Sequence, residues 1–344
     1  MAKLLLVIIA SITACSAALA QGDNTDNEFL KYGYPGPESD FLLRSRYAAS
    51  YNRALRNPNW VAEHLTRDNL NGTADRSNAD FKEDPAIPVA FRALLKDYYR
   101  SGFDRGHMCP AADAKKDLDS MKETFILTNI APQVGAGFNR NYWAYLEKFV
   151  RDLTATFDDV YCISGPLYLP TKEGDKWFVK YQVIGDPPNV AVPTHFFKAI
   201  LAKNSADATF ALGAFALPNE AIDNSTPLTE FDIPIESVEK AAGLSFFNKV
   251  DHNTETIVPL CTATTSAATA AVLSGPASWA APLVSEPPSS FESDPDAALG
   301  LLPALKSDWM RLRSDAAFDV AWSKPLTIFE VAWSKPLATF DVAP

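Results

Sequence analysis

Apolar and polar positions along the chain follow two periods, one typical of strands and one of helices. Short apolar runs between turn residues predict strands at 47–51, 60–65, 124–128, 160–166, 178–183, 195–201 and 209–214. Apolar residues at three- to four-residue spacing predict helices at 88–99, 139–155 and 238–243, with a short helix at 119–123. Residues 56–59 are predicted to form the turn between the first two strands, and 80–85 a loop. The pattern indicates a sheet with helices interspersed between its strands.

The two ends of the chain differ from this body. Residues 1–20 resemble a targeting segment, because Lys3 precedes a short apolar run and Ala18-Leu19-Ala20 has the small-x-small form of a signal-peptidase site. A bacterial lipoprotein box around Cys15 is the alternative. The apolar run is too short to predict a stable membrane span. Residues 21–30 are a polar linker, and 31–261 form the body. Residues 262–344, rich in Thr, Ala, Ser and Pro and closed by an 11-residue repeat, are predicted to be mostly disordered.

Composition qualifies this picture without excluding an anionic substrate. The net charge of −11 argues against a nucleic-acid partner if taken over the whole chain. A local field counts for more at a cleft, and 41–60 contains four arginines and no acid. The four cysteines match no zinc motif and give no even disulfide framework once the leader is set aside. The chain has only four histidines, so histidine chemistry has few candidates.

Two polar runs contain the candidate chemistry. The first is Asp104-Arg105-Gly106-His107; the second begins at Thr128-Asn129 and continues through Asn139 to Glu147. A neutral imidazole can activate water near neutral pH, and a hard divalent cation prefers oxygen ligands while keeping several waters. His107 is therefore the candidate base, Asn139 the candidate metal ligand, and Glu147, about two helical turns later, the candidate partner of metal-bound waters. In an extended segment Arg105 points to the same side as His107, and Gly106 leaves room for a phosphate.

Each of these residues also has an ordinary structural interpretation. Asp-Arg-Gly-His could form a turn with a surface salt bridge, Asn139 could cap a helix, and Glu147 could be a solvated helix residue. Only their order and spacing together favour a site. His64 and His195, which lie in apolar strand-like runs, are expected to be structural.

With these residues in view, the chain resembles the DNA/RNA non-specific endonucleases with a ββα-metal active site, and within them the mitochondrial endonuclease G group of fungal type. The matching segments are 104–107, 128–133, 138–143 and 146–147, with flanking matches at 31–37, 56–61, 164–170 and 192–197. The resemblance covers about 31–261. It implies an α+β fold: a mixed or antiparallel β-sheet core with flanking helices and a ββα-metal motif.

The resemblance also implies a mechanism and an assembly. Its site residues would be His107 as general base, Asn139 as direct ligand of Mg²⁺ or Mn²⁺, Glu147 on the metal-bound waters, Arg105 and Arg76 as catalytic arginines, and Asn129 and Arg140 in substrate binding. Substrates would be single- and double-stranded DNA and RNA, cut with little sequence preference to leave 5′-phosphates. A homodimer in mitochondria, in the intermembrane space or at the inner membrane, would follow, whereas the chemistry of the leader favours secretion.

Two other functions stay open at this point. One is a nucleic-acid-binding protein of the same fold that has lost catalysis. The other is a cysteine hydrolase that pairs Cys109 with His107, although these residues are only two positions apart and lack a third orienting group. Cys109 also raises the question of redox sensitivity near a metal.

Overall fold

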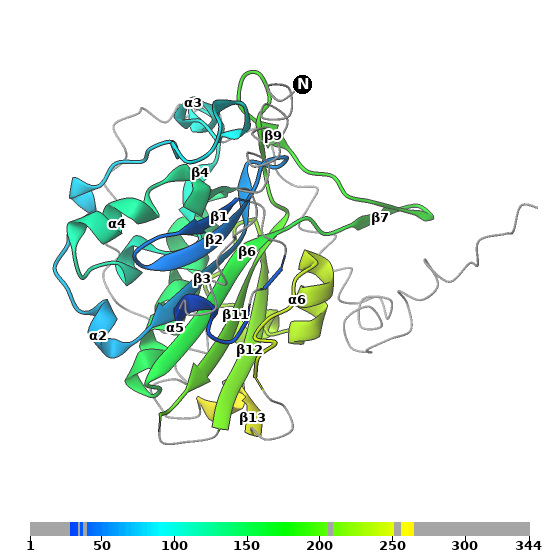
Figure 1. Cartoon of the computed structure of the whole chain (residues 1–344). Helices are drawn as coiled ribbons and strands as arrows, with labels where there is room; N and C mark the ends of the chain where they lie inside the picture. The colour runs from blue at the N-terminus through cyan, green and yellow to red at the C-terminus, as the bar shows by residue number, and fades with distance from the viewer. Residues whose placement is uncertain (1–27, 34, 37–39, 206–208, 251–255, 265–344) are drawn as a thin grey trace, which may run out of the picture.

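The fold is built on a central seven-stranded sheet, shown in a computed structural model that describes residues 28–33, 35–36, 40–205, 209–250 and 256–264 (Figure 1). The leader, His252 and the C-terminal repeat lie outside the described residues. In sheet order the strands are β1 (Phe41–Leu43), β2 (Tyr47–Asn52), β3 (Asn57–Leu65), β6 (Asp159–Leu167), β11 (His195–Lys203), β12 (Thr209–Pro218) and β13 (Thr256–Pro259). All neighbours are antiparallel except β12 and β13, which are parallel. The predicted α+β class is confirmed.

The sheet separates two apolar cores, because successive strand residues point to opposite faces. On β11, Phe196 and Ile200 pack into one core, whereas Phe197 and Leu201 pack into the other. The second core is covered by α6 (Ile235–Ala242) and by the short helix η1 (Glu28–Leu30). The first core is covered by the long segment between β3 and β6, which lies on the other side of the sheet in Figure 1.

This covering segment contains a ββα unit. Its elements are α2 (Arg67–Leu70), η2 (Arg76–Asn78), η3 (Val89–Phe91), α3 (Leu95–Tyr98), β4 (Asp104–His107), η4 (Ala111–Asp113), α4 (Leu118–Thr124), η5 (Leu127–Asn129), β5 (Ile130–Gln133), η6 (Gly135–Trp143), α5 (Ala144–Asp152) and η7 (Leu153–Ala155). β4 and β5 pair as an antiparallel ribbon, with His107 opposite Ile130. η6 and α5 follow β5 directly, so the two strands and the helix form one local unit.

The predicted single strand at 178–183 is wrong, because Phe178 ends one strand of a projecting arm and Val183 begins another strand, with no strand assigned between them. β7 (Thr171–Glu173) and β8 (Lys176–Phe178) form a hairpin that extends from the body, and Trp177 on it is 61% exposed (Figure 1). The chain then returns through β9 (Val183–Ile184) and β10 (Val190–Ala191), a second small ribbon. The remaining elements are η8 (Leu228–Phe231) and α7 (Leu260–Ala263). No described helix is long and apolar enough to cross a membrane.

The predicted helix at 88–99 is also wrong: only η3 and α3 form there. Val89 is 70% exposed, so its helical spacing does not reflect a buried face. The hydroxyl of Tyr51 donates to the carbonyl oxygen of Phe91 at 3.0 Å and accepts from the amide of Ala93 at 3.1 Å. These two bonds use backbone groups that a continuous helix needs for its own hydrogen bonds.

The predicted strand at 124–128 lies a few residues too early, since the strand at this place is β5, which begins at Ile130. α4 continues to Thr124, and the carbonyl oxygen of Thr124 accepts a bond from the side chain of Asn129 at 2.8 Å. The loop from Thr124 to Asn129 is therefore closed on itself by a side chain. An apolar run of this length does not distinguish a buried strand from a buried turn.

The turn between β2 and β3 also differs from the prediction of 56–59, because β3 already begins at Asn57. The side-chain oxygen of Asn52 accepts from the amides of Ala54 and Leu55, and Arg56 takes a positive φ of 56°. Pro58 is tolerated in the strand because β6 pairs with β3 only from Val61 onward.

Candidate active site

Strand β4 points Arg105 and His107 toward the same ring. The guanidinium carbon of Arg105 lies 4.3 Å from the centroid of the Phe81 ring, and the imidazole of His107 lies 5.4 Å from it. Both contacts follow from the two-residue period of a strand, as the sequence predicts. Arg105 is half-buried, and burial lowers the pKa of its guanidinium.

The imidazole of His107 contacts two phenyl rings. Besides Phe81, the ring of Phe125 meets it edge-on with centroids 4.8 Å apart. Its Nε2 is buried and has no hydrogen-bond partner among the described residues. Burial first, and then the positive charges of Arg76 and Arg105, lower the pKa of His107 to about 3. The ring is therefore neutral at physiological pH and can accept a proton. Sequence reasoning missed Phe81 and Phe125, because isolated phenylalanines give no signal beyond hydrophobicity.

Gly106 is required for a different reason from the one inferred from the sequence. A Cβ at this position would lie 2.0 Å from Oε1 of Gln133, whose buried side chain crosses the ribbon there. The side chain of Gln133 fills the room that the sequence argument reserved for a phosphate. Gly106 thus allows β4 and β5 to pair closely.

The amide of Asn139 is oriented by Asp104. Nδ2 of Asn139 donates to Oδ2 of Asp104 at 2.9 Å, and this bond links η6 to β4. Arg140 holds the same carboxylate with two bonds of 2.8 and 2.6 Å. Among the described residues, Oδ1 of Asn139 accepts no hydrogen bond, so this oxygen is available to a cation. The indole of Trp143 donates to the carbonyl oxygen of His107 at 3.3 Å, and this bond connects η6 to β4 a second time.

Glu147 lies on α5 of the same ββα unit and is partly buried. Burial raises the pKa of its carboxyl group to about 7, while the positive charges of Lys198 and Arg151 oppose this shift. Within the described residues, no group of three His, Cys, Asp or Glu side chains comes together as a metal cage. The donors present therefore fit a hydrated, hard divalent cation held by one amide oxygen, with a carboxylate to accept from its waters.

Arg76 joins the site from a separate element, η2. Its guanidinium carbon lies 5.7 Å from the centroid of Phe125, and its charge acts on both His107 and Glu147. The structure thus brings Arg76, Arg105 and His107 around one pair of phenyl rings.

Asn129 occupies a different place from the one expected of a substrate contact. It is fully buried; Oδ1 accepts from the amide of Cys109 at 2.9 Å, and Nδ2 donates to the carbonyl oxygens of Cys109 and Thr124 at 2.9 and 2.8 Å. Both the oxygen and the nitrogen of the Asn129 side chain therefore bond to backbone groups inside the protein. These bonds fix the backbone just after His107, and a role of Asn129 in substrate binding stays a prediction.

Replacing Asn129 with alanine is expected to destabilise the fold by about 3 kcal/mol, because three buried backbone groups lose their partners. In a domain of this size such a loss lowers Tm by about 10 °C. Thermal melting followed by circular dichroism measures this shift, with Asn71→Ala, an exposed asparagine, as control. A Tm within about 1 °C of the wild type would contradict the assignment.

The hypothesis that Cys109 is a nucleophile is wrong. The thiol is completely buried, and burial raises its pKa well above the ordinary value, so that it stays protonated. A protonated thiol without access to solvent can neither attack a substrate nor react readily with oxidants. His64 has a structural role, as expected: Nε2 lies 2.7 Å from Asp159, and the ring stacks on Tyr161.

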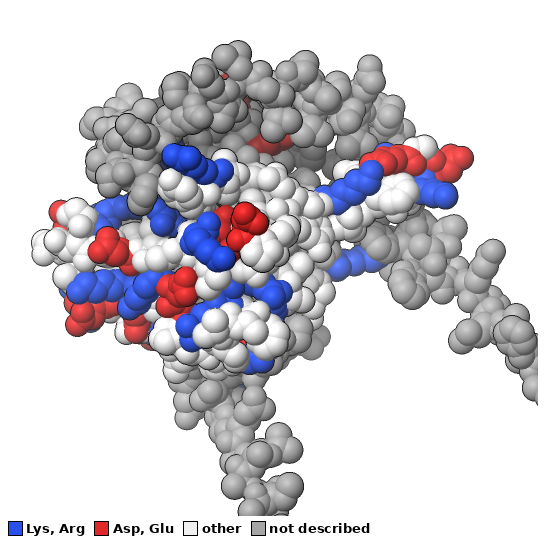
Figure 2. All heavy atoms as spheres, turned by 90° about the horizontal axis from the view of Figure 1, so that it is seen from above, with Lys and Arg blue, Asp and Glu red and all other residues white. Residues whose placement is uncertain are grey.

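Two of the four arginines of residues 41–60 are paired with acids. Arg44 pairs with Asp84 at 2.6 Å, and Arg53 pairs with Asp40 at 2.5 Å. Figure 2 shows basic and acidic side chains close together on the face seen from above. Arg76 and Arg105 bring positive charge to the site itself, where both act on His107.

Comparisons with known proteins agree with this geometry. Residues 25–253 match the family model described as DNA/RNA non-specific endonuclease. The chain is 54% identical to "Nuclease C1" of Cunninghamella echinulata over 69% of this chain and 94% of that protein. It is 52% identical to "Mitochondrial nuclease" of Saccharomyces cerevisiae over 64% of this chain and 70% of that protein. A crystal structure of an EndoG/EndoGI complex matches with a TM-score of 0.65 and 43% identity, covering 71% of this chain and 100% of the solved one.

Proposed function

The chain belongs to the DNA/RNA non-specific endonuclease family and is a nuclease, and we propose that it hydrolyses phosphodiester bonds in both DNA and RNA with His107 as general base and a divalent metal ion, Mg²⁺ or Mn²⁺, held by Asn139. One observation carries this proposal: two hydrogen bonds, from Asn139 to Asp104 and from Trp143 to His107, join the strand that bears the base to the helix that bears the amide oxygen.

Each residue of the site has a separate role in hydrolysis. His107 is neutral and takes a proton from the attacking water. Arg76 and Arg105 hold the scissile phosphate by charge-assisted hydrogen bonds. A phosphate between them offsets their charge, and this raises the pKa of His107 toward a value better suited to a base. Asn139 would hold the metal ion and Glu147 would accept hydrogen bonds from its waters; when bound, the ion would supply charge neutralisation at the phosphoryl oxygens.

Asn129 and Arg140 hold other residues of the site in position. Asn129 fixes the backbone after His107, and Arg140 fixes Asp104, which in turn orients Asn139. Arg140 is also half-exposed and can reach a neighbouring phosphate, which is the substrate role that we propose for it. Contacts of this kind are made to phosphates and not to base edges, so we propose little sequence preference and 5′-phosphorylated products.

A nicking assay tests this function directly. Supercoiled plasmid and a structureless RNA are incubated with the purified protein in Mg²⁺, in Mn²⁺ and in excess EDTA. We expect cleavage of both substrates with either metal and a loss of at least about a hundredfold in EDTA. Binding of nucleic acid without nicking under any of these conditions would instead indicate a protein that has lost catalysis.

We also propose a mitochondrial location and a homodimer. Relatives named mitochondrial, including "Endonuclease G, mitochondrial" of Bos taurus at 44% identity, support the location, although secretion through the leader is the alternative. The N-terminal residue of the mature protein and its co-fractionation with mitochondria distinguish the two. Sedimentation equilibrium tests the dimer, and a monomeric mass at all concentrations would overturn it.

A further inference from the structure

Three aromatic rings meet at the centre of the site. The rings of Phe81 and Phe125 contact one another with centroids 4.9 Å apart, and each contacts the imidazole of His107, at 5.4 and 4.8 Å. Edge-to-face contacts at such distances are favourable and directional. The imidazole is thus held in position by two phenyl rings in addition to its own backbone.

The same two rings also hold the two arginines. Arg105 lies over Phe81 at 4.3 Å, and Arg76 lies near Phe125 at 5.7 Å. Arginine stacks on aromatic faces through cation–π attraction, which limits the positions that the guanidinium can take. Each ring therefore restricts one arginine, and His107 is in contact with both rings.

We propose that Phe81 and Phe125 form an aromatic clamp that positions His107, Arg76 and Arg105 as one unit. The proposal rests on the function proposed above. The two phenylalanines are positioning residues, since they touch the three proposed catalytic groups and need not touch substrate.

Two backbone hydrogen bonds join the segments that carry the two rings of the clamp and so fix the separation of these rings. The amide of Lys82 donates to the carbonyl oxygen of Phe125 at 3.1 Å, and the amide of Leu127 donates to the carbonyl oxygen of Lys82 at 2.9 Å. These bonds join the two segments directly beside the rings. Phe125 is buried, and Phe81 is partly buried.

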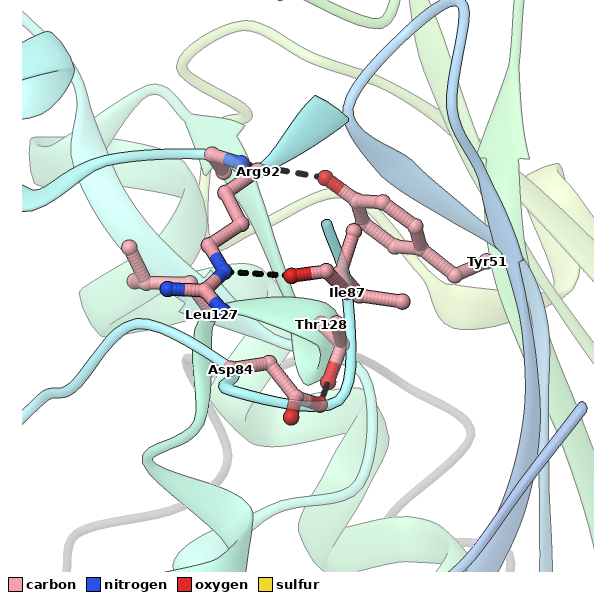
Figure 3. A pocket seen from close by; sticks show the side chains of 7 residues that line it. Tyr51, Asp84, Ile87, Arg92, Leu127 and Thr128 are labelled. Carbon is pink, nitrogen blue, oxygen red and sulfur yellow. Dashed lines mark hydrogen bonds between the residues drawn. The ribbon is translucent and has the colours of Figure 1, made fainter. Parts of the chain in front are cut away.

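The loop that follows Phe81 is anchored in turn (Figure 3). Oδ2 of Asp84 accepts from the hydroxyl of Thr128 at 2.7 Å and from Arg44 at 2.6 Å. The side chain of Arg92 donates back to the carbonyl oxygen of Ile87 within the same loop, as the dashed line in Figure 3 shows. The hydrogen bonds of Asp84 with Thr128 and Arg44 restrict the loop. The position of Phe81 is therefore determined by these bonds as well as by the packing of its ring.

The clamp also limits the contact of the imidazole with bulk solvent. Nε2 of His107 is buried while the residue as a whole is partly buried, and the charged groups that lower its pKa are Arg76 from η2 and Arg105 from β4, both of them cations. Opening the clamp would admit water and let the guanidinium groups move. Both changes favour the protonated imidazole, which cannot serve as a base.

The test uses Phe81→Leu and Phe125→Leu in the full chain, with Phe91→Leu as a matched control. Phe91 also carries an arginine, Arg53 at 5.1 Å, but this pair takes no part in the site. We expect the clamp variants to lose about 10- to 100-fold in kcat/KM on plasmid, because small displacements of catalytic groups are costly. Phe81→Tyr, which keeps the ring, should retain activity within about threefold of wild type, and Phe91→Leu should behave like wild type.

A second readout does not depend on cleavage. The ¹⁵N signal of the His107 ring, assigned with His107→Ala, should stay in its neutral form from about pH 5 to 8 in wild type and begin to titrate in the clamp variants. Wild-type kcat/KM together with an unchanged titration in both folded variants would overturn the clamp. Absence of nicking in the wild type would overturn the proposed function instead, and the titration would still decide on the clamp.

Discussion

His107→Ala is expected to lower cleavage of plasmid DNA and RNA by about 10³-fold or more while the protein stays folded. General-base catalysis contributes about 10²- to 10⁴-fold. The ring contacts Phe81 and Phe125 in the segment between β3 and β6, outside the central sheet, so its loss leaves the sheet intact.

The measurement is the initial rate of plasmid nicking in Mg²⁺, with melting curves to verify the fold. His64→Gln is a suitable control, because the imidazole of His64 contacts Asp159 and Tyr161 on β6 of the central sheet. This substitution is expected to alter stability but not turnover. A folded His107→Ala protein that nicks plasmid at a rate near that of the wild type would remove the base from the proposed mechanism.

The sequence predicts the halves of the site better than the way in which they are joined. The motif around His107 and the helix that contains Asn139 and Glu147 are recognisable because polar residues with complementary chemistry recur at a fixed spacing. The contact between these halves depends on Asp104, whose carboxylate orients the amide of Asn139. An aspartate beside an arginine in the sequence gives no indication of which distant amide it will bind.

The aromatic clamp and the position of Asn129 show a second limit. Phe81 lies in a loop and Phe125 ends a helix, so neither belongs to a periodic pattern that would predict their contact. Asn129 follows the strand predicted at 124–128 and is predicted to bind substrate, yet its side chain turns inward to satisfy three backbone groups. Sequence patterns report burial on average, whereas local hydrogen bonds decide where a turn replaces a strand.

The sheet itself follows from the sequence wherever one face of a strand must be buried. β2, β6, β11 and β12 lie where apolar runs predict strands, and the alternation on β11 divides its residues between two cores. The segment at 178–183 is the exception, since its exposed residues Phe178, Val179 and Tyr181 resemble the composition of a buried strand. Composition alone cannot distinguish these cases, because it does not report what covers the strand.

Asn139→Ala is expected to abolish productive metal binding and to lower cleavage by about 10²- to 10⁴-fold, a change similar to that of removing the metal with EDTA. The structure also predicts smaller losses of metal affinity for variants of Asp104 and Arg140. Asp104→Ala leaves the amide of Asn139 in place but without its orienting partner, so metal affinity should fall by about 10- to 100-fold. Arg140→Met retains the bond between Asp104 and Asn139 and should have a smaller effect.

Isothermal titration with Mn²⁺ in the absence of nucleic acid measures binding, and the dependence of nicking on Mg²⁺ concentration measures its consequence. If Asn139 is the protein ligand, high Mg²⁺ restores much of the activity of Asp104→Ala and little of that of Asn139→Ala. This difference separates the ligand from the residue that orients it. Equal rescue of both variants would mean that the amide oxygen does not touch the metal, and the ligand would then have to be sought at Glu147 on the following helix.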